Sequence, residues 1–306
     1  MKVIVTGGAG FIGHHVALHL LRKGYEVTVI DNLSRSKPEN VENLRKEGIE
    51  PVKKDILAKD LPKVFSDLSP DAVVHAAALI SVDESMRKPL LYHKVNSTGT
   101  LNVLRACVKA GCTQIVYLSS AAVYGNPVNL PIDEGHPLNP LSPYGASKLS
   151  GELYVRVYEA YGLKYTVLRL FNVYGPGQSR EYAGVIIRFI ERVKKGLPPI
   201  IFGDGKQTRD FIYVDDVVSA VELALKKRVS GVFNIATGQP VTILGLAKII
   251  CRLAGLDLKP VFQDPRPGDI RHSYASIEKA RKKLKWRPEV SLETGLRKLL
   301  KYTSVL

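Results

Sequence analysis

The sequence predicts an α/β protein in which a doubly wound parallel β-sheet is followed by a smaller, mostly helical C-terminal lobe. Three observations carry this prediction. Short apolar strands alternate with helices through the first half of the chain, the first strand runs into a glycine-rich turn that opens a helix, and after Leu170 Gly and Pro cluster. Alternating strands and helices imply right-handed crossovers, and therefore a parallel sheet covered by helices on both faces.

The first elements establish the alternation. The β-branched run Lys2–Thr6 is typical of a buried parallel strand. Phe11–Lys23 follows with helical periodicity and stops at Gly24, a residue type that commonly terminates helices. Glu26–Ile30 is the next predicted strand, and Pro38–Glu47 is the next helix.

The same alternation continues along the chain. Further strands are predicted at Pro51–Lys53, Asp71–His75, Gln114–Ser119 and Lys164–Leu170. Two long helical stretches separate the later strands, namely Val82–Ala110, which is interrupted near Pro89, and Pro143–Tyr161. We expect one more pair, the helix Asp215–Lys227 and the strand Val232–Ile235, to rejoin the sheet.

Composition excludes several classes of protein. The chain has 306 residues, of which 45% are apolar and 24% charged, so it is neither disordered, fibrous nor a disulfide scaffold. Cys107, Cys112 and Cys251 form no CxxC pair and fit reduced thiols. No apolar run approaches the ~20 residues of a membrane span, and the first residues do not resemble a signal peptide. We therefore expect a cytoplasmic protein with no membrane partner.

The charge balance is strongly basic. Lys and Arg number 44 against 29 Asp and Glu, which gives a net charge of +15. This excess is compatible with nucleic acid, a membrane surface or an anionic small substrate. The basic blocks Lys226–Arg228 and Lys279–Arg287 interleave with Leu at helical spacing, which favours solvated helix faces. A nucleic-acid partner is therefore not expected, because a basic surface alone is only the first step of that argument.

A dinucleotide-binding turn follows the first strand. Gly7, Gly10 and Gly13 stand between this strand and the first helix, which is the context that the glycine pattern requires. Gly7 allows the tight turn, Gly10 lets a pyrophosphate approach the backbone, and Gly13 lets the helix pack on the sheet. The helix N-terminus then faces the phosphates.

Acidic residues at the next strand ends favour NAD over NADP. Asp31 ends the second strand, where a carboxylate accepts hydrogen bonds from the adenosine ribose and repels a 2′-phosphate. Arg35 lies nearby and argues the other way, since an arginine can accommodate that phosphate. Asp55 and Ile56 end the third strand and could flank the adenine, although Asp55 could also cap the next segment.

Three histidines on the first helix raise the question of a metal site. His15 and His19 are four residues apart and could share an ion, with His14 beside them. No carboxylate or cysteine completes the set, whereas a catalytic zinc ion usually has three protein ligands. We interpret these histidines as packing or surface residues and expect no metal.

A catalytic constellation is predicted around Tyr144 and Lys148. These residues are four apart, so on a helix they lie on one face. A free tyrosine has a pKa of about 10, but a neighbouring ammonium and the positive nicotinamide ring of NAD favour the phenolate and make it a general base. Ser120, at the end of the strand Gln114–Ser119, supplies a hydroxyl at the same sheet edge that can hydrogen-bond the reacting oxygen.

The chain resembles the extended short-chain dehydrogenases/reductases, and within them it is most similar to UDP-glucose 4-epimerases and related nucleotide-sugar epimerases. The likeness runs through TGGAGFIG, DNLS, HAAALISV, VNSTGT, SSAAVYG, SPYGASK, RLFNVYGPGQ, GDGKQTRDFIYVDD, FNIATG and PRPGDIRHS, which span nearly the whole sequence. It implies a Rossmann domain for NAD over residues 1–170, rejoined by 210–236, and a nucleotide-sugar lobe formed by 171–209 and 237–306.

The resemblance also implies the site residues. Ser120, Tyr144 and Lys148 would be catalytic. The NAD site would be lined by Gly7, Gly10, Phe11, Ile12, Gly13, Asp31, Asn32, Asp55, Ile56, Ala76, Ala77, Asn96, Tyr144, Lys148 and Phe171. The UDP-sugar would contact Ser120, Tyr144, Asn172, Gly184, Val185, Ile200, Ile201, Phe202, Arg209, Arg266, Asp269 and Ser273. Independently of the family, Arg209 and Arg266 suit a diphosphate, since arginine offers a rigid fork of donors.

The reaction implied is interconversion of UDP-glucose and UDP-galactose by transient oxidation at C4, in a homodimer paired through the stretches Val82–Ala110 and Pro143–Tyr161. Family dehydratases and decarboxylases carry an acid near the catalytic hydroxyl residue, whereas here Ser120 is followed by Ala121–Val123. UDP-N-acetylglucosamine and UDP-glucuronate epimerases remain alternatives. A non-catalytic member that senses NAD or binds RNA would be expected to lose Tyr144 or Lys148, and both are present.

One position bears on substrate breadth. In the alignment on Gly268 and Asp269, Ser273 stands where some epimerases of the family carry a tyrosine bordering the sugar C2 substituent. A small residue there leaves room for an N-acetyl group. The alternatives are that the shortened loops refill this space or that Tyr274 swings into it.

Overall fold

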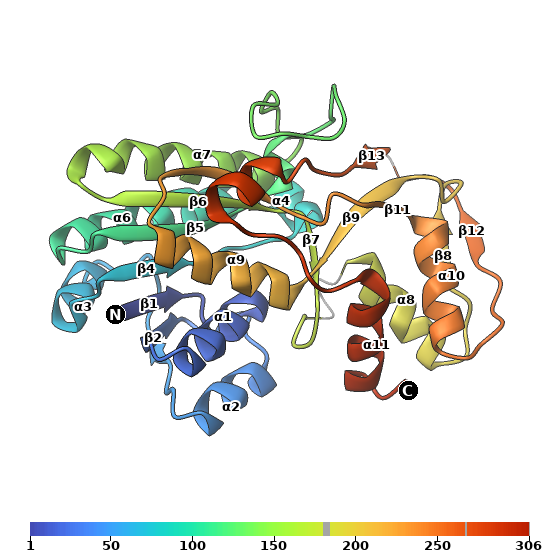
Figure 1. Ribbon diagram of the computed structural model, residues 1–306, viewed down its shortest axis with the longest axis horizontal. Helices are drawn as coiled ribbons and strands as arrows, with labels where there is room; N and C mark the ends of the chain where they lie inside the picture. The colour runs from blue at the N-terminus through green and yellow to red at the C-terminus, as the bar shows by residue number, and fades with distance from the viewer. Residues whose placement is uncertain (180–183, 267, 306) are drawn as a thin grey trace.

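The structure is a computed structural model that describes residues 1–179, 184–266 and 268–305 (Figure 1). Within these residues the main sheet has seven strands in the order β10-β6-β5-β4-β1-β2-β3, and all neighbours are parallel. The strands are β1 (Lys2–Thr6), β2 (Glu26–Asp31), β3 (Val52–Lys53), β4 (Ala72–His75), β5 (Gln114–Ser120), β6 (Lys164–Leu170) and β10 (Gly231–Ile235). The strand order reverses between β1 and β4, and ligands of such sheets bind outside the strand ends at that point.

Helices cover both faces of this sheet. The first face carries α3 (Leu61–Leu68), α6 (Gly99–Lys109) and α7 (Pro143–Val157), and the second carries α1 (Phe11–Arg22), α2 (Pro38–Lys46) and α9 (Val214–Lys227). Strand side chains alternate between the two cores: Ile4 packs with the first set of helices, whereas Val3 and Val5 pack with the second. The doubly wound parallel sheet expected from the sequence is therefore confirmed.

The predicted helical stretch Val82–Ala110 consists of several pieces. They are α4 (Val82–Arg87), α5 (Pro89–Tyr92), the π-helical turn η1 (His93–Thr98) and α6. Lys88, which precedes Pro89, leaves the helical region at φ −130° and ψ 54°. The break follows from the steric restriction that a proline places on the residue before it.

Most of the rest of the chain forms the lobe at the right of Figure 1, whereas the π-helical turn η4 (Ala280–Leu284) packs on α9 and β10 of the main sheet. The helices of the lobe are α8 (Val185–Lys194), α10 (Ile243–Leu253) and α11 (Leu292–Tyr302). Two small sheets join them, one of β7 (Asn172–Tyr174), β9 (Thr208–Tyr213), β11 (Pro240–Thr242) and β13 (His272–Ser273), the other of β8 (Ile200–Phe202) and β12 (Val261–Gln263). These strands were not predicted from the sequence, because most of them span only two or three residues and show no periodicity.

The two parts share a continuous core. The cluster that contains Val16 of α1 and Val217 of α9 also contains Phe189 of α8 and Ile250 of α10. The lobe is therefore packed onto the sheet through apolar contacts, next to the strand ends where the site is expected. Among the described residues, no helix is both long and apolar enough to cross a membrane.

Candidate functional site

The turn between β1 and α1 is built for glycine. Gly7 has φ +68°, and a Cβ there would lie 2.5 Å from the backbone of Ala77, just past the end of β4. A Cβ on Gly13 would lie 2.1 Å from the carbonyl oxygen of Gly7, so the helix could not approach the sheet with a larger residue. The N-terminus of α1 is thereby held at the point where the strand order reverses.

Asp31, at the end of β2, faces this turn. Its carboxylate accepts hydrogen bonds from the backbone N–H of Ala9 (3.0 Å) and of Leu33 (2.7 Å), and from the Ser36 hydroxyl (3.2 Å). Arg35 does not lie against Asp31 in an ion pair; its guanidinium instead donates to both carboxylate oxygens of Glu84, at 2.9 and 3.1 Å. Arg35 nevertheless lines the same cavity as Asp31, so its contact with a 2′-phosphate stays a prediction.

Two adjoining cavities run along the strand ends, with volumes of about 360 and 380 Å³. The first lies between the glycine turn and the Tyr144–Lys148 face of α7, and the second reaches Asp31, Asn32, Asp55 and Ile56. The residues that line both cavities are Gly7, Gly10, Arg35, Ala76, Ala78 and Leu79. The two cavities thus form one elongated groove, centred on the glycine turn.

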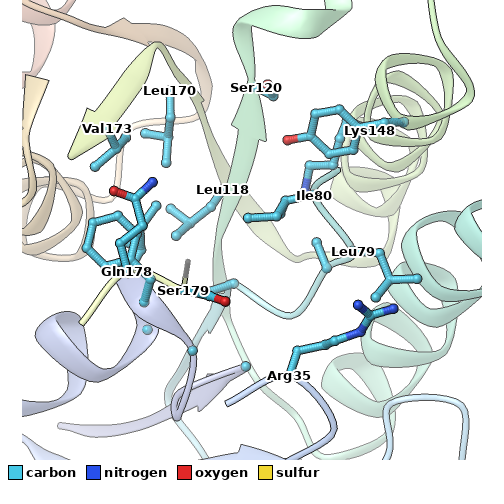
Figure 2. A pocket seen from close by; sticks show the side chains of 18 of the residues that line it. Arg35, Leu79, Ile80, Leu118, Ser120, Lys148, Leu170, Val173, Gln178 and Ser179 are labelled. Carbon is cyan, nitrogen blue, oxygen red and sulfur yellow. The ribbon is translucent and has the colours of Figure 1, made fainter. Parts of the chain in front are cut away.

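The three predicted catalytic residues meet in the first cavity. Ser120, Tyr144 and Lys148 all line it, and the Ser120 hydroxyl, which accepts from the Ala122 N–H (3.1 Å), acts to lower the pKa of Tyr144. Figure 2 places Ser120 and Lys148 on one side of the cavity, with Gln178 across from them. The helix that carries the pair begins with the Ser142 hydroxyl accepting from the Gly145 N–H, followed by Pro143 at its first turn.

Burial dominates the electrostatics of this pair. It raises the pKa of Tyr144, an effect that the nearby Ser120 hydroxyl partly offsets. Burial also lowers the pKa of Lys148 to about 7, although Glu152, one turn further along α7, acts to raise it. The Lys148 ammonium lies 4.3 Å from the centre of the Tyr117 ring. Burial of the phenol is therefore the dominant influence on Tyr144 among the protein groups, and the lowering of its pKa by Lys148 stays a prediction.

The residues expected around NAD come together almost completely. All of them line one or both cavities except Asn96. Asn96 is buried beside the groove, where its Oδ1 accepts from the Leu79 N–H (2.8 Å) and its Nδ2 donates to the Leu79 carbonyl (2.9 Å) and the Ser147 hydroxyl (3.0 Å). Its position supports the wall of the first cavity.

The residues expected around the UDP-sugar are more dispersed. Only Ser120 and Tyr144 line the first cavity, while the others lie in the lobe. Asn172 donates its amide to the Asp210 carbonyl (3.0 Å). Gly184 precedes α8, which begins at Val185. Ile201, the middle residue of β8, is fully buried in the core, so its side chain is closed to a ligand.

Two arginines of the lobe are already engaged with neighbouring groups. Arg209 on β9 forms an ion pair with Asp269 at 2.5 Å. Ser273 on β13 lies opposite Arg209 in the pairing of these two parallel strands. The guanidinium of Arg266 stacks on the Phe202 ring at 3.9 Å from its centre. The lobe thus gathers five of the expected residues into two neighbouring groups, Arg209–Asp269–Ser273 and Phe202–Arg266.

Several groove residues were missed by the sequence reasoning. They are Lys37, Asn40, Ile80, Glu84, Tyr92, Val173, Gln178 and Ser179. Glu84 and Tyr92 belong to a stretch whose pattern indicates only a helix, so nothing in it marks a cavity. Gln178 follows YGPG, and that cluster of turn residues was the only available sign that this loop lies at the groove.

The histidines of α1 are hydrogen-bonded to protein groups. His14 Nδ1 donates to the Gly10 carbonyl (2.9 Å), and burial, with His15 beside it, lowers its pKa to about 4. His15 Nε2 donates to the Pro176 carbonyl (2.9 Å), and His19 Nε2 lies 2.6 Å from Glu222. These contacts tie α1 to the loop before Gln178 and to α9.

The chain is similar in sequence and structure to known nucleotide-sugar epimerases. The model of the NAD dependent epimerase/dehydratase family matches residues 3–236. A UDP-glucose 4-epimerase from Thermotoga maritima, solved with UDP-glucose, is 42% identical, with a TM-score of 0.94 and 99% of each chain covered. A UDP-N-acetylglucosamine 4-epimerase from Methanobrevibacter ruminantium, in complex with UDP-N-acetylmuramic acid, is 41% identical, with a TM-score of 0.94 over 99% of this chain and 98% of that one. A UDP-glucuronic acid 4-epimerase from Bacillus cereus, in complex with UDP-glucuronic acid and NAD, is 34% identical, with a TM-score of 0.91 and 99% of each chain covered.

Proposed function

The chain belongs to the NAD dependent epimerase/dehydratase family and is a nucleotide-sugar 4-epimerase of that family, and on this premise we propose that it interconverts UDP-glucose and UDP-galactose. The observation that carries the proposal is the meeting of Ser120, Tyr144 and Lys148 in the cavity that begins at the glycine turn. A non-catalytic role in sensing NAD or binding RNA would not require this constellation.

The residues of the groove fit NAD. The glycine turn holds the N-terminus of α1, where a pyrophosphate would bind, at the groove, because larger residues at Gly7 and Gly13 would collide with the protein backbone and could not form this turn. Two side chains of the first cavity, Asn40 and Gln178, each keep a buried amide oxygen without a hydrogen-bond partner among the described residues. Asp31 stands where the adenosine ribose hydroxyls would be bound, and Asp55 and Ile56 line the end that would hold the adenine.

The protein side of the reaction is proton handling. Tyr144 would accept the proton of the sugar 4-hydroxyl and later return it, while Ser120 would hydrogen-bond the same oxygen. Lys148, as a cation, would favour the tyrosinate. Bound NAD would supply the hydride acceptor and donor for C4, and its positive ring would offset the effect of burial on Tyr144. If the 4-keto sugar turned its opposite face toward the cofactor before the hydride returned, the configuration at C4 would be inverted with no net oxidation.

The lobe would hold the nucleotide while the sugar turns. Arg209 and Arg266 would bind the diphosphate, and Asp269 and Asn172 would contact the nucleotide-sugar beside them. Gly184, Val185 and β8 would lie near the uridine. Binding energy from this distant part of the ligand would retain the reactive 4-keto sugar.

The acidic residues of the cavity favour epimerisation over elimination or decarboxylation. Ser120 is followed by the apolar turn η2 (Ala121–Val123), which holds no acid. Among the described residues that line the first cavity, the only carboxylate is that of Glu84, and it is paired with Arg35. Elimination would need a general acid and base beyond Tyr144.

The proposal is tested by incubating the purified protein with UDP-galactose and following the formation of UDP-glucose. UDP-N-acetylglucosamine and UDP-glucuronate are assayed in parallel, with Tyr144→Phe as the inactive control. We expect conversion of UDP-galactose that depends on Tyr144. Turnover of UDP-glucuronate alone would replace the proposed substrate while leaving the reaction class intact.

A further inference from the structure

The ion pair between Arg35 and Glu84 lies at the groove, because both residues line the first cavity and Arg35 also lines the second. Arg35 comes from the loop after β2, and Glu84 comes from α4, which follows β4. In the sheet, β2 and β4 are the two neighbours of β1, whose end carries the glycine turn. The pair therefore joins the loop after β2 to the helix after β4, one on each side of this turn.

Arg35 is also the one charged residue that lines both cavities of the described chain. A dinucleotide that reaches from Asp31 to Tyr144 has to pass the junction of the two cavities, where the α1 N-terminus would meet its pyrophosphate. Figure 2 shows the Arg35 side chain extending from its loop toward Leu79, another residue of the junction. The Arg35 side chain is thus placed beside the path of the dinucleotide.

Both partners of the pair are held in place. The loop of Arg35 is fixed by Asp31, whose carboxylate binds the Leu33 N–H (2.7 Å) and the Ser36 hydroxyl (3.2 Å), with Leu33 at φ +60°. The pKa of Glu84 is lowered mainly by the hydrogen bond from Arg35, so this carboxyl group stays ionised. Contacts within the protein therefore position the loop of Arg35 and the helix of Glu84.

The Glu84 end is anchored to the catalytic side of the groove. The Tyr92 hydroxyl donates to Glu84 (3.1 Å) and accepts from the Ser81 N–H (3.0 Å). Burial raises the pKa of Tyr92 to about 12, so this hydroxyl keeps its proton. The Tyr92 ring in turn meets the Tyr144 ring edge-on, with 6.4 Å between the ring centres. Lys88 adds a second cation on Glu84 at 3.2 Å.

We infer that the Arg35–Glu84 ion pair is a latch that retains the dinucleotide, and that it opens when the cofactor enters or leaves. The inference rests on NAD binding by the groove and deepens the proposed function by naming what controls cofactor retention. An enzyme that oxidises and then reduces the same sugar gains from such a latch, because loss of the reduced cofactor between the two steps would strand the 4-keto intermediate. A simple phosphate contact by Arg35 would not need Glu84.

The test measures dissociation of the dinucleotide in the absence of any sugar nucleotide. Protein loaded with NADH is mixed with excess NAD, and the loss of bound-NADH fluorescence gives the dissociation rate. The variants are Arg35→Met, which keeps the aliphatic stem, Glu84→Gln, which keeps the shape but removes the charge, and the reversed pair Arg35→Glu with Glu84→Arg. The matched control is Arg45→Met, which removes an exposed arginine paired with Glu50. Thermal unfolding of each variant checks that the fold is retained.

A latch predicts that Arg35→Met and Glu84→Gln each speed NADH release about tenfold, which corresponds to about 1.4 kcal/mol, and that the reversed pair restores part of the retention. Arg45→Met should leave the rate unchanged. Faster release in Arg35→Met combined with unchanged or slower release in Glu84→Gln would overturn the latch, because it would identify Arg35 as a phosphate ligand that Glu84 restrains. A wild-type protein that binds no dinucleotide would overturn both the latch and the proposal that the groove binds NAD. Retained NADH with no turnover of the sugar nucleotides would overturn only the proposed substrate.

Discussion

Glu152 and Arg169 form an ion pair in the interior of the protein, with their side chains only 2% and 4% exposed and 2.7 Å between Oε2 and the nearer guanidinium nitrogen. Glu152 also accepts a hydrogen bond from the Ser119 hydroxyl (2.5 Å), and Arg169 donates to the Tyr124 hydroxyl (3.0 Å). Ser119 precedes the catalytic candidate Ser120, and Glu152 lies one helical turn beyond Lys148. The pair thus connects β5, β6 and α7 beside the proposed active site.

Removal of one charge from this pair should shift the pH dependence of turnover. Glu152 acts to raise the pKa of Lys148, so Glu152→Gln should lower that pKa further and leave less of the cation at neutral pH. We expect the alkaline limb of kcat to move to lower pH by about one unit, and the free energy of unfolding to fall by about 3 kcal/mol because Arg169 stays buried without its partner.

The matched variant Arg169→Gln should move the alkaline limb the opposite way, since Glu152 is then left facing Lys148 alone. Both variants destabilise the fold, so opposite shifts in the pH profile separate electrostatic positioning from simple loss of structure. Parallel shifts in the two profiles, or none, would contradict this role for the pair. The measurement is kcat against pH together with thermal unfolding.

Tyr144→Phe should reduce kcat for UDP-galactose by at least about a thousandfold, because it removes the proposed general base. Tyr154→Phe, on the same helix, serves as the matched control and should retain turnover. Near-normal kcat in Tyr144→Phe would exclude Tyr144 as the base.

Lys148→Met should abolish most turnover and at the same time stabilise the protein. The side chain is buried, and its pKa of about 7 lies below the ordinary 10.5, so the folded state is penalised for keeping it charged. This penalty is complete below pH 7 and disappears as the pH rises toward 10.5. We expect a gain of about 1–3 kcal/mol at pH 6 that shrinks by pH 10. Denaturant unfolding at the two pH values measures the gain in the free energy of unfolding. A larger gain at pH 10 than at pH 6 would contradict the interpretation that burial of the charged Lys148 costs stability.

The cofactor preference should depend on Asp31. Nucleotide-stripped protein should recover activity with NAD at concentrations at least about a hundredfold below those needed with NADP, because the carboxylate repels a 2′-phosphate. Asp31→Ala should narrow this difference, while Asp67→Ala, which removes an exposed carboxylate from α3, should not. Equal recovery with both cofactors by the wild-type protein would refute the assignment.

Substrate breadth should depend on Ser273. The residue is half-buried on β13, in register with Arg209. We predict some turnover of UDP-N-acetylglucosamine as well as UDP-glucose, and selective loss of the acetylated substrate by about tenfold or more in Ser273→Tyr, which fills the space at C2. Ser273→Ala, which adds no bulk, should retain both activities. The measurement is kcat/KM for the two sugars in each protein. Undetectable turnover of the acetylated sugar by the wild type would refute the prediction that Ser273 leaves room for the N-acetyl group.

How far local sequence patterns determine this protein is clear from the glycine turn and from α7. The turn needs only neighbouring residues to form, and Tyr144 and Lys148 share a face because of helical geometry alone. The strands of the main sheet were likewise predictable, since each is a short apolar run bounded by turn residues. These features, together with Asp31 at a strand end, were sufficient to predict the parallel sheet and the place of the groove at its strand ends, whereas most of the individual NAD-site residues were predicted from the family resemblance.

The tertiary structure decided the pairings and the electrostatics. Arg35 lies near Asp31 in sequence, yet it pairs with Glu84 because β2 and β4 flank β1 in the sheet. Glu152 meets Arg169 because β6 lies beside β5, against which α7 packs. Burial, which no spacing encodes, raises the pKa of Tyr144 instead of lowering it. The sequence by itself determined which chemical groups stand at the ends of the strands; strand order and burial, which depend on contacts between distant segments, decided what those groups face and which charge they carry.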